Sequence, residues 1–121
     1  DLDAWLELGN LQIHLKKLNA AIYAFQQALE TDSNCDQAYQ RIAWIYADQE
    51  VYLDLAEKFA AKAVKIDPSA SNLSTSSYVY FKNGKYDKAK ELIQRAINIE
   101  PKNQAYHTQL RDIQNARQNE Q

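Results

Sequence analysis

The stretch Ser69–Phe81, SASNLSTSSYVYF, decides whether this chain forms one continuous fold or two fragments. Its first part is rich in serine and threonine, as in a flexible linker, whereas its last four residues are bulky. One interpretation is a disordered break between two domains, and the other is a helix. The spacing of residues on either side of the stretch chooses between them.

Residues of similar kind recur about every 34 positions along the chain, and internal repeats of this length are typical of helical solenoids. The step is 34 in four sets: Trp5, Tyr39 and Leu73; Gly9, Ala43 and Ser77; Gln12, Tyr46 and Tyr80; Leu18, Tyr52 and Tyr86. It is 35 and then 33 in four later sets: Ala21, Ala56 and Ala89; Phe25, Ala60 and Ile93; Ala28, Ala63 and Ala96; Ser33, Pro68 and Pro101. The second unit therefore has one extra residue, which we place between Tyr52 and Ala56.

The recurring small residues have a physical role, because they allow two helix backbones to approach closely while larger side chains fill the space beside them. The side chains expected to fill this space are Trp5, Leu8, Phe25, Ile42, Tyr46, Leu73, Tyr80 and Ile93. Pro68 and Pro101 disfavour the helical conformation of the residue before each of them, and so end the second helix of a unit. The pattern predicts pairs of antiparallel helices.

Four segments carry this pattern, and they resemble the tetratricopeptide repeat, a helix pair of about 34 residues: AWLELGNL, AAIYAFQQAL, AEKFAAKAVKIDP and YDKAKELIQRAINIEP. The chain departs from the family pattern at Gln12, Ser33 and Ser76, which replace an aromatic residue, a proline and a large apolar residue. The resemblance implies an all-α solenoid of antiparallel helix pairs that forms a right-handed superhelix. We expect one domain over 1–121, with units at about 2–35, 36–69 and 70–103 and a capping helix at about 104–118.

The repeat settles the meaning of the serine-rich stretch. In register, Leu73 falls where Trp5 and Tyr39 fall, and Ser77 takes the position of the small residue. The stretch is therefore predicted to be a helix. Because each serine costs about half a kcal/mol relative to alanine in a helix, we expect this helix to be the softest element and to depend on its neighbours. The segment after Pro101 is expected to cap the solenoid through one stripe of residues, namely Tyr106, Leu110, Ile113 and Arg117.

Composition limits the kinds of partner. A net charge of -2 and a pI near 5.6 give no electrostatic reason to expect nucleic acid, and no apolar run approaches the roughly 20 residues of a membrane span, so membrane insertion is not expected. The single cysteine, Cys35, cannot form an internal disulfide. The chain has no methionine and begins at Asp1, so we expect it to be part of a longer protein. The compartment stays open, with a soluble, cytoplasmic protein slightly favoured.

The sequence offers little for catalysis. His14 and His107 have no partner at metal-ligand spacing, and the two glycines cannot build a phosphate-binding loop. Cys35 precedes Asp36, whose charge disfavours a reactive thiolate. No nucleophile can be paired with a base. We therefore expect a non-enzymatic protein without catalytic residues, metal or cofactor.

The first helices of the units are expected to line a concave groove, at positions next to the packed ones. The candidate peptide-binding residues are Leu6, Asn10 and Ile13 in the first unit, Gln40, Arg41 and Trp44 in the second, and Ser74, Tyr78 and Phe81 in the third. Trp44 and Tyr78 lie one unit apart and offer large contact areas, as binding surfaces do. In the alternative, which stays open, Trp44 and Tyr78 only pack between neighbouring first helices.

The resemblance also permits a test for one family subtype. Domains similar to those of chaperone cofactors hold a C-terminal carboxylate with a Lys, two Asn, a Lys and an Arg. Here only Asn10 matches, since the other four positions hold Leu6, Arg41, Ser71 and Thr75. Binding of chaperone tails is therefore disfavoured, although Arg41 could hold an acidic group.

Our main hypothesis is a scaffold that binds a peptide or a partner protein in the groove. A second hypothesis is the structural end of a longer array that self-associates through exposed Trp5 and Leu6. A third is an accessory module of a larger enzyme. A 35-residue RNA-reading helical repeat is disfavoured by the acidic balance and by the repeated alanines.

Overall fold

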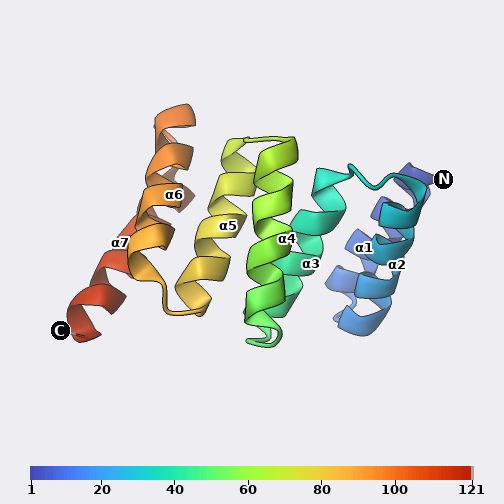
Figure 1. The fold of residues 1–121 in the computed structure, drawn as a ribbon, viewed down its shortest axis with the longest axis horizontal. Helices are drawn as coiled ribbons and strands as arrows, with labels where there is room; N and C mark the ends of the chain where they lie inside the picture. The colour runs from blue at the N-terminus through green and yellow to red at the C-terminus, as the bar shows by residue number, and fades with distance from the viewer. Residues whose placement is uncertain (121) are drawn as a thin grey trace.

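The computed structural model describes residues 1–120, and this part of the chain is an all-α solenoid of antiparallel helix pairs. The seven helices are α1 (Leu2–His14), α2 (Leu18–Thr31), α3 (Asp36–Asp48), α4 (Leu53–Ile66), α5 (Ala70–Lys82), α6 (Tyr86–Ile99) and α7 (Gln104–Glu120). The helix pairs and α7 follow one another in chain order along the solenoid, with the two termini at opposite ends (Figure 1). Three helix pairs and a terminal helix correspond to the three repeats and the cap predicted from the sequence.

The serine-rich stretch forms α5, which confirms the helical interpretation. The helix is capped by Ser69, whose Oγ accepts a hydrogen bond of 3.2 Å from the backbone N–H of Asn72. Leu73 and Val79 are buried on its inner side. Because α5 contacts both α4 and α6, tertiary packing compensates for the weak helix propensity of its serines. The relative softness of α5 stays a prediction.

The small residues of the repeat are buried where helices meet, as predicted. Ala21, Ala56 and Ala89 are all fully buried. At Gly9, an added Cβ atom would lie 2.6 Å from the ring of Phe25, so the ring would have to move to make room for it. Glycine at this position therefore makes room for the largest buried side chain of the first unit.

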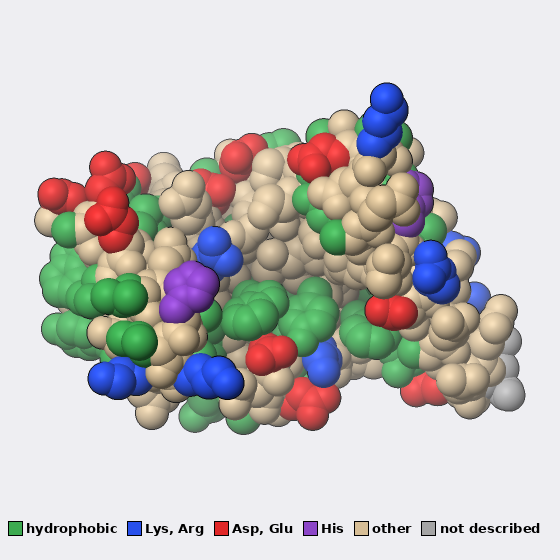
Figure 2. Space-filling model, turned by 180° about the vertical axis from the view of Figure 1, so that it is seen from behind, with side chains coloured by type: hydrophobic (Ala, Val, Ile, Leu, Met, Phe, Trp, Pro, Cys, Tyr) green, Lys and Arg blue, Asp and Glu red, His purple; other side chains and the backbone are tan. Residues whose placement is uncertain are grey.

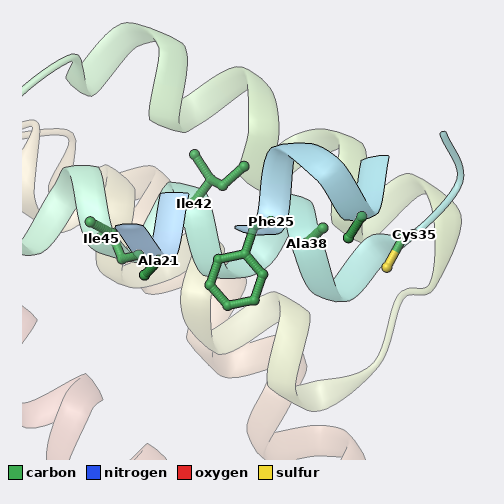
Figure 3. Close-up of a cluster of buried hydrophobic side chains, with 7 residues drawn as sticks. Ala21, Phe25, Cys35, Ala38, Ile42 and Ile45 are labelled. Atoms are coloured by element: carbon green, nitrogen blue, oxygen red, sulfur yellow. The ribbon is translucent and has the colours of Figure 1, made fainter. Parts of the chain in front are cut away.

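The residues expected to fill the core are buried or partly buried, with one exception. Phe25, Ile42, Leu73 and Ile93 are fully buried, and Trp5, Tyr46 and Tyr80 partly so. Figure 3 shows Phe25 among Ala21, Cys35, Ala38, Ile42 and Ile45 of the first core cluster. The prediction for Leu8 is wrong, since 38% of it is exposed. Leu8 takes the position that Ile42 takes in α3, and Ile42 packs in a cluster shared with α2, whereas no described helix precedes α1.

The second helix of each unit ends where one residue leaves the helical conformation. Asp67 (φ −142°, ψ 104°) and Glu100 (φ −127°, ψ 74°) precede Pro68 and Pro101, as predicted. Asp32 adopts the same conformation as Asp67 (φ −145°, ψ 104°), although a serine follows it. The geometry of the turn between units is therefore kept even where proline is missing.

The extra residue of the second unit is Tyr52 itself, so its predicted placement after Tyr52 is wrong. Lys16, Glu50 and Gly84 lie 34 apart and all have positive φ, but Tyr52 has a further positive φ of 49°. The next residue, Leu53, begins α4, just as Leu18 begins α2. Tyr52 is tolerated in this conformation as a 70% exposed residue whose ring meets that of Tyr46 at a centroid distance of 5.2 Å.

The terminal helix α7 packs against α6 and, more lightly, against α5. Ile113 is fully buried, and Tyr106 and Leu110 are partly buried against the same cluster. Arg117 lies at the exposed end of the predicted stripe, where its Nε is 2.8 Å from Oδ1 of Asp87. The helix runs to Glu120, two residues beyond the expected boundary at 118.

Candidate functional site

The first helices of the three units lie on one face of the solenoid, and this face is hollowed. Figure 2 looks onto it and shows apolar side chains gathered across its middle, with separate acidic and basic groups around them. A pocket of about 370 Å³ lies between α1, α3 and α5. We call it the groove pocket, and its lining residues are Leu6, Asn10, Phe25, Asp36, Gln37, Gln40, Arg41, Asp67, Ser69, Ser71 and Asn72.

Four of the nine predicted binding residues meet in the groove pocket, namely Leu6, Asn10, Gln40 and Arg41. They come from two different units, which the repeat register places side by side. Arg41 is exposed and takes part in no ion pair among the described residues. Its guanidinium, which stays charged at any physiological pH, is therefore free to meet an anionic group of a ligand.

A buried hydrogen-bond network holds the pocket wall in place. Asn72 is 3% exposed, and its Nδ2 lies 2.9 Å from Oδ2 of Asp36, 2.8 Å from the carbonyl oxygen of Asp67 and 3.3 Å from that of Ala63. These contacts join α5 to α3 and to the end of α4. Sequence reasoning missed Asn72, although one signal was present. The repeat places it where the second unit has Ala38, and a polar residue at a buried position requires partners.

Gln40 is also held in place. It is 8% exposed, and its Nε2 donates a hydrogen bond of 2.8 Å to Oγ of Ser71. This bond links α3 to α5 across the pocket wall. On one side of the pocket, the amides of Gln40 and Asn72 are therefore fixed by hydrogen bonds. Arg41, which also lines the pocket, is exposed.

Ile13, Trp44 and Tyr78 do not line the groove pocket. Ile13 and Trp44 are partly buried against the first core cluster. Tyr78 is partly buried as well, and its hydroxyl donates a hydrogen bond of 2.9 Å to Oδ1 of Asp48. Each of these three side chains therefore packs against the protein with one part and leaves another part exposed to solvent.

The phenol of Tyr78 is held in its neutral form. Burial, then the hydrogen bond to Asp48 and the charges of Asp48 and Glu50, raise the pKa of Tyr78 to about 12. The ammonium group of Lys82 lies 5.7 Å from the centre of its ring. Tyr78 therefore offers an aromatic face and a fixed hydroxyl rather than a titrating group.

Ser74 and Phe81 are engaged by elements outside the groove pocket. The Oγ of Ser74 donates to Oε1 of Gln109 on α7, and Nε2 of Gln109 donates to the carbonyl oxygen of Ser74, both at 2.8 Å. Phe81 packs beside Tyr86 with ring centres 5.7 Å apart. These two residues anchor α5 to its C-terminal neighbours.

The other chemically active side chains are dispersed. His14 is exposed, and Nε2 of His107 lies 2.8 Å from the carbonyl oxygen of Pro101. Cys35 is buried at the start of α3. Over residues 1–120, no group of three or more His, Cys, Asp or Glu is placed to hold a metal ion. None of the helices in that range is long and apolar enough to cross a membrane.

The apolar end face differs from the one expected. Trp5 and Leu6 are only partly exposed, because Trp5 packs edge-on against Tyr23 at a centroid distance of 6.2 Å and Leu6 lines the groove pocket. The exposed apolar residues of this region are Leu8 (38%), Leu11 (52%) and Leu15 (53%). Leu8 and Leu11 share one side of α1, since residues three apart share a helix face, and Leu15 directly follows the helix.

Models of the tetratricopeptide repeat match residues 2–35, 36–69 and 71–103. No curated protein sequence matches the chain. Among solved structures, the first repeat domain of Spaghetti (RPAP3) bound to the HSP90 peptide SRMEEVD is 23% identical, with a TM-score of 0.87, over 95% of this chain and 91% of that one.

Two further structures are similar over part of their length. YrrB, described as a tetratricopeptide repeat protein with an unusual peptide-binding site, is 25% identical, with a TM-score of 0.78, over 89% of this chain and 56% of that one. A mutant O-GlcNAc transferase from Thermobaculum terrenum is 18% identical, with a TM-score of 0.88, over 93% of this chain and 22% of the transferase.

Proposed function

Because the chain belongs to the tetratricopeptide repeat family, we propose that it is a non-enzymatic interaction module that binds a peptide or a segment of a partner protein in its concave groove. The observation that carries the proposal is the exposed Arg41, without an ion pair among the described residues, at a preorganised pocket. Partly exposed Trp44 and Tyr78 lie on first helices of the same solenoid. Such a surface supplies one charged contact and two aromatic anchors.

The geometry favours an extended segment that carries an acidic group and apolar side chains. The acidic group would pair with Arg41, while Leu6 and the amides of Asn10 and Gln37 contact the neighbouring backbone. The apolar side chains would pack against the exposed parts of Ile13 and Trp44. Since rim charges mainly affect association and orientation, most of the affinity would come from the aromatic anchors.

Selection of peptides from a random display library on the immobilised domain tests this proposal. Selected peptides should lose at least about tenfold in affinity with Arg41→Glu, because the acidic group of the peptide would then face a like charge. Their free energy of binding should weaken by about 2 kcal/mol or more with Trp44→Leu, because this change removes the indole and keeps an apolar contact with the core. Isothermal titration calorimetry provides both measurements.

The matched control is Arg111→Glu, an exposed residue of α7 that does not line the groove pocket, which makes the same charge reversal. It should leave the affinity of the selected peptides unchanged. Library members that bind Arg41→Glu and Trp44→Leu as tightly as the wild type would contradict the groove as the binding surface. The same conclusion would follow if no library member bound the wild type.

The peptide SRMEEVD separates this groove from that of the chaperone cofactors. Only Asn10 matches the carboxylate-binding pattern, so the wild-type chain should bind the peptide at least about 100-fold more weakly than a grafted variant. The graft carries Leu6→Lys, Arg41→Asn, Ser71→Lys and Thr75→Arg. Equal affinity of wild type and graft would show that a carboxylate is recognised here by other residues.

Self-association is a second candidate function, favoured by the exposed stripe on α1. Leu8 and Leu11 are exposed, whereas Ile42 and Ile45, their equivalents 34 residues on, are 1% exposed because a preceding unit covers them. Light scattering over a range of concentrations tests this candidate. A dimer that dissociates with Leu11→Glu supports it, and a monomer at millimolar concentration rules it out.

A further inference from the structure

A second pocket, on the opposite face from the groove, results from two departures from the repeat. Ser76 on α5 lies 34 residues after Ile42, which fills the equivalent space in the preceding unit and is 1% exposed. Leu92 on α6 likewise lies 33 residues after the larger Phe59. The smaller side chains leave a pocket of about 240 Å³ between α4, α5 and α6, which we call the Ser76 pocket. Figure 1 shows α5 flanked by α4 and α6.

The lining of the Ser76 pocket combines apolar walls with a basic rim. Its lining residues are Ala61, Val64, Lys65, Ser76, Tyr80, Lys88, Leu92 and Arg95. The rim has three cations, and no acidic residue is among the described residues that line it. Lys88 is 3.5 Å from Glu91 in an exposed pair, whereas Lys65 and Arg95 make no ion pair within residues 1–120.

The size of the pocket indicates the kind of occupant. Pockets that hold a whole small-molecule ligand measure about 300–1,000 Å³, and this one is smaller. One apolar side chain is the better fit, because its burial against Val64 and Leu92 is favourable without further polar partners. The unbalanced positive charge of Lys65 and Arg95 then favours acidic residues beside that side chain.

We propose that the Ser76 pocket is a docking site for a segment of a partner protein in which one apolar side chain is flanked by acidic residues. The apolar side chain enters between α4 and α6, and the acidic residues meet Lys65, Lys88 and Arg95 on the rim. The site is separate from the groove pocket, whose lining shares no residue with it. One chain can therefore hold two different segments at once.

Titration of the ¹⁵N-labelled protein with the capped peptide acetyl-Glu-Glu-Leu-Glu-Glu-amide tests the proposal by NMR. Amide shifts should be concentrated at Val64, Ser76 and Leu92. Replacement of the peptide's leucine by glycine should weaken binding about tenfold or more, because the buried leucine side chain supplies the apolar contact. Equal binding of both peptides would overturn the proposal.

Two protein variants test the apolar and the charged part separately. Ser76→Ile fills the pocket and should abolish the leucine-dependent shifts. The double variant Lys65→Glu and Arg95→Glu changes only exposed side chains, so it tests the proposal even if Ser76→Ile fails to fold. It should weaken binding at least tenfold.

Arg111→Glu, an exposed residue that lines neither the groove pocket nor the Ser76 pocket, is the control and should leave the shifts at Val64, Ser76 and Leu92 unchanged. Shifts that persist in Ser76→Ile or in the double variant would show that the peptide binds elsewhere. Either result would overturn the proposal.

Discussion

The two junctions between repeats share one backbone arrangement but are held together by different forces. Where the first unit meets the second, the buried residues of the first core cluster are all apolar. Where the second unit meets the third, Asn72 replaces Ala38 and Ser76 replaces Ile42. Ser77 also replaces Ala43, which lies outside the first core cluster, at the contact of α5 with α6. All six residues are 3% exposed or less.

The difference shows that the repeat prescribes how closely the helices approach, but not what fills the space. At the first junction, large side chains such as Phe25 supply burial and close packing. At the second junction, Asn72 bonds to three oxygens, and within the third unit Ser77 donates a 2.7 Å hydrogen bond to the carbonyl oxygen of Ala89 on α6. Because serine at position 76 is smaller than isoleucine at position 42, the second junction also leaves room for a pocket.

The largest effect is expected at the first junction, where Phe25→Ala removes the largest fully buried side chain. We expect the free energy of unfolding to fall by about 3–5 kcal/mol, because the change loses apolar burial and leaves a cavity. Urea denaturation monitored by circular dichroism measures it. The control is Tyr23→Ala on the same helix, which is 57% exposed and should cost much less. Equal losses for the two variants would contradict the assignment of this core.

A smaller loss is expected at the second junction with Asn72→Ala, which gives α5 the residue found at the equivalent position of α3. The carbonyl oxygen of Asp67 and the carboxylate of Asp36 would lose a donor, whereas the carbonyl oxygen of Ala63 keeps its bond from the backbone N–H of Asp67; an unsatisfied buried group costs about 1–3 kcal/mol. Asn98→Ala, at an exposed position of α6, is the control, since no hydrogen bond of its side chain is among those of the described residues. Hydrogen exchange should accelerate in α5 and α6 before α1 and α2. Uniform acceleration along the chain would show that the two junctions unfold together.

The sequence predicted what depends on spacing. The helix pairs, the buried small residues and the helical nature of 70–82 all follow from positions about 34 apart. It did not predict the Asn72 network, because the partners of a buried amide are backbone oxygens at places that only the folded turn defines. The prediction misplaced the inserted residue by one position. Tyr52 is the same residue type as Tyr86, the first residue of α6, and only its positive φ shows that it precedes α4.

The candidate site was predicted in part for the same reason. Register places Leu6, Asn10, Gln40 and Arg41 on adjacent first helices, and they do line one pocket. Register does not show which exposed positions are taken by other elements, so the pairing of Ser74 with Gln109 on the cap was not anticipated.

The Ser76→Ile substitution should make the second junction more like the first. Isoleucine would occupy the space that Ile42 occupies one unit earlier, and cavity filling commonly raises the free energy of unfolding by about 0.5–2 kcal/mol. Thermal and urea denaturation measure the gain. Ser77→Ile is the contrasting control, because Ser77 is fully buried against α6 and an added side chain would overpack that contact at a cost of about 1–3 kcal/mol. A loss of stability in both variants would show that the pocket is already closed around Ser76.

The smallest effect concerns the hydrogen bond between Tyr78 and Asp48, which joins α5 to α3 across the second junction. At the first junction the equivalent residues are Trp44 and His14, between which no such bond is formed within residues 1–120. The pKa of Tyr78 is raised from 10.0 to about 12, so the folded chain holds this proton more tightly than the unfolded chain. The contribution is fully present below pH 10 and is lost as the pH rises from 10 to 12. The free energy of unfolding of the wild type should fall more steeply in that window than that of Tyr78→Phe.

Comparison of these two proteins isolates Tyr78, because Tyr86 and Tyr106, whose pKa values are also raised, titrate in both. Asp48→Asn should lower the pKa of Tyr78 only part of the way to its ordinary value, because burial, the largest cause of the shift, remains. Tyrosinate absorbance, recorded as the difference between each protein and its Tyr78→Phe counterpart, measures this pKa. A return to the ordinary value in Asp48→Asn would mean that the charge of Asp48, and not burial, holds the phenol neutral at the second junction.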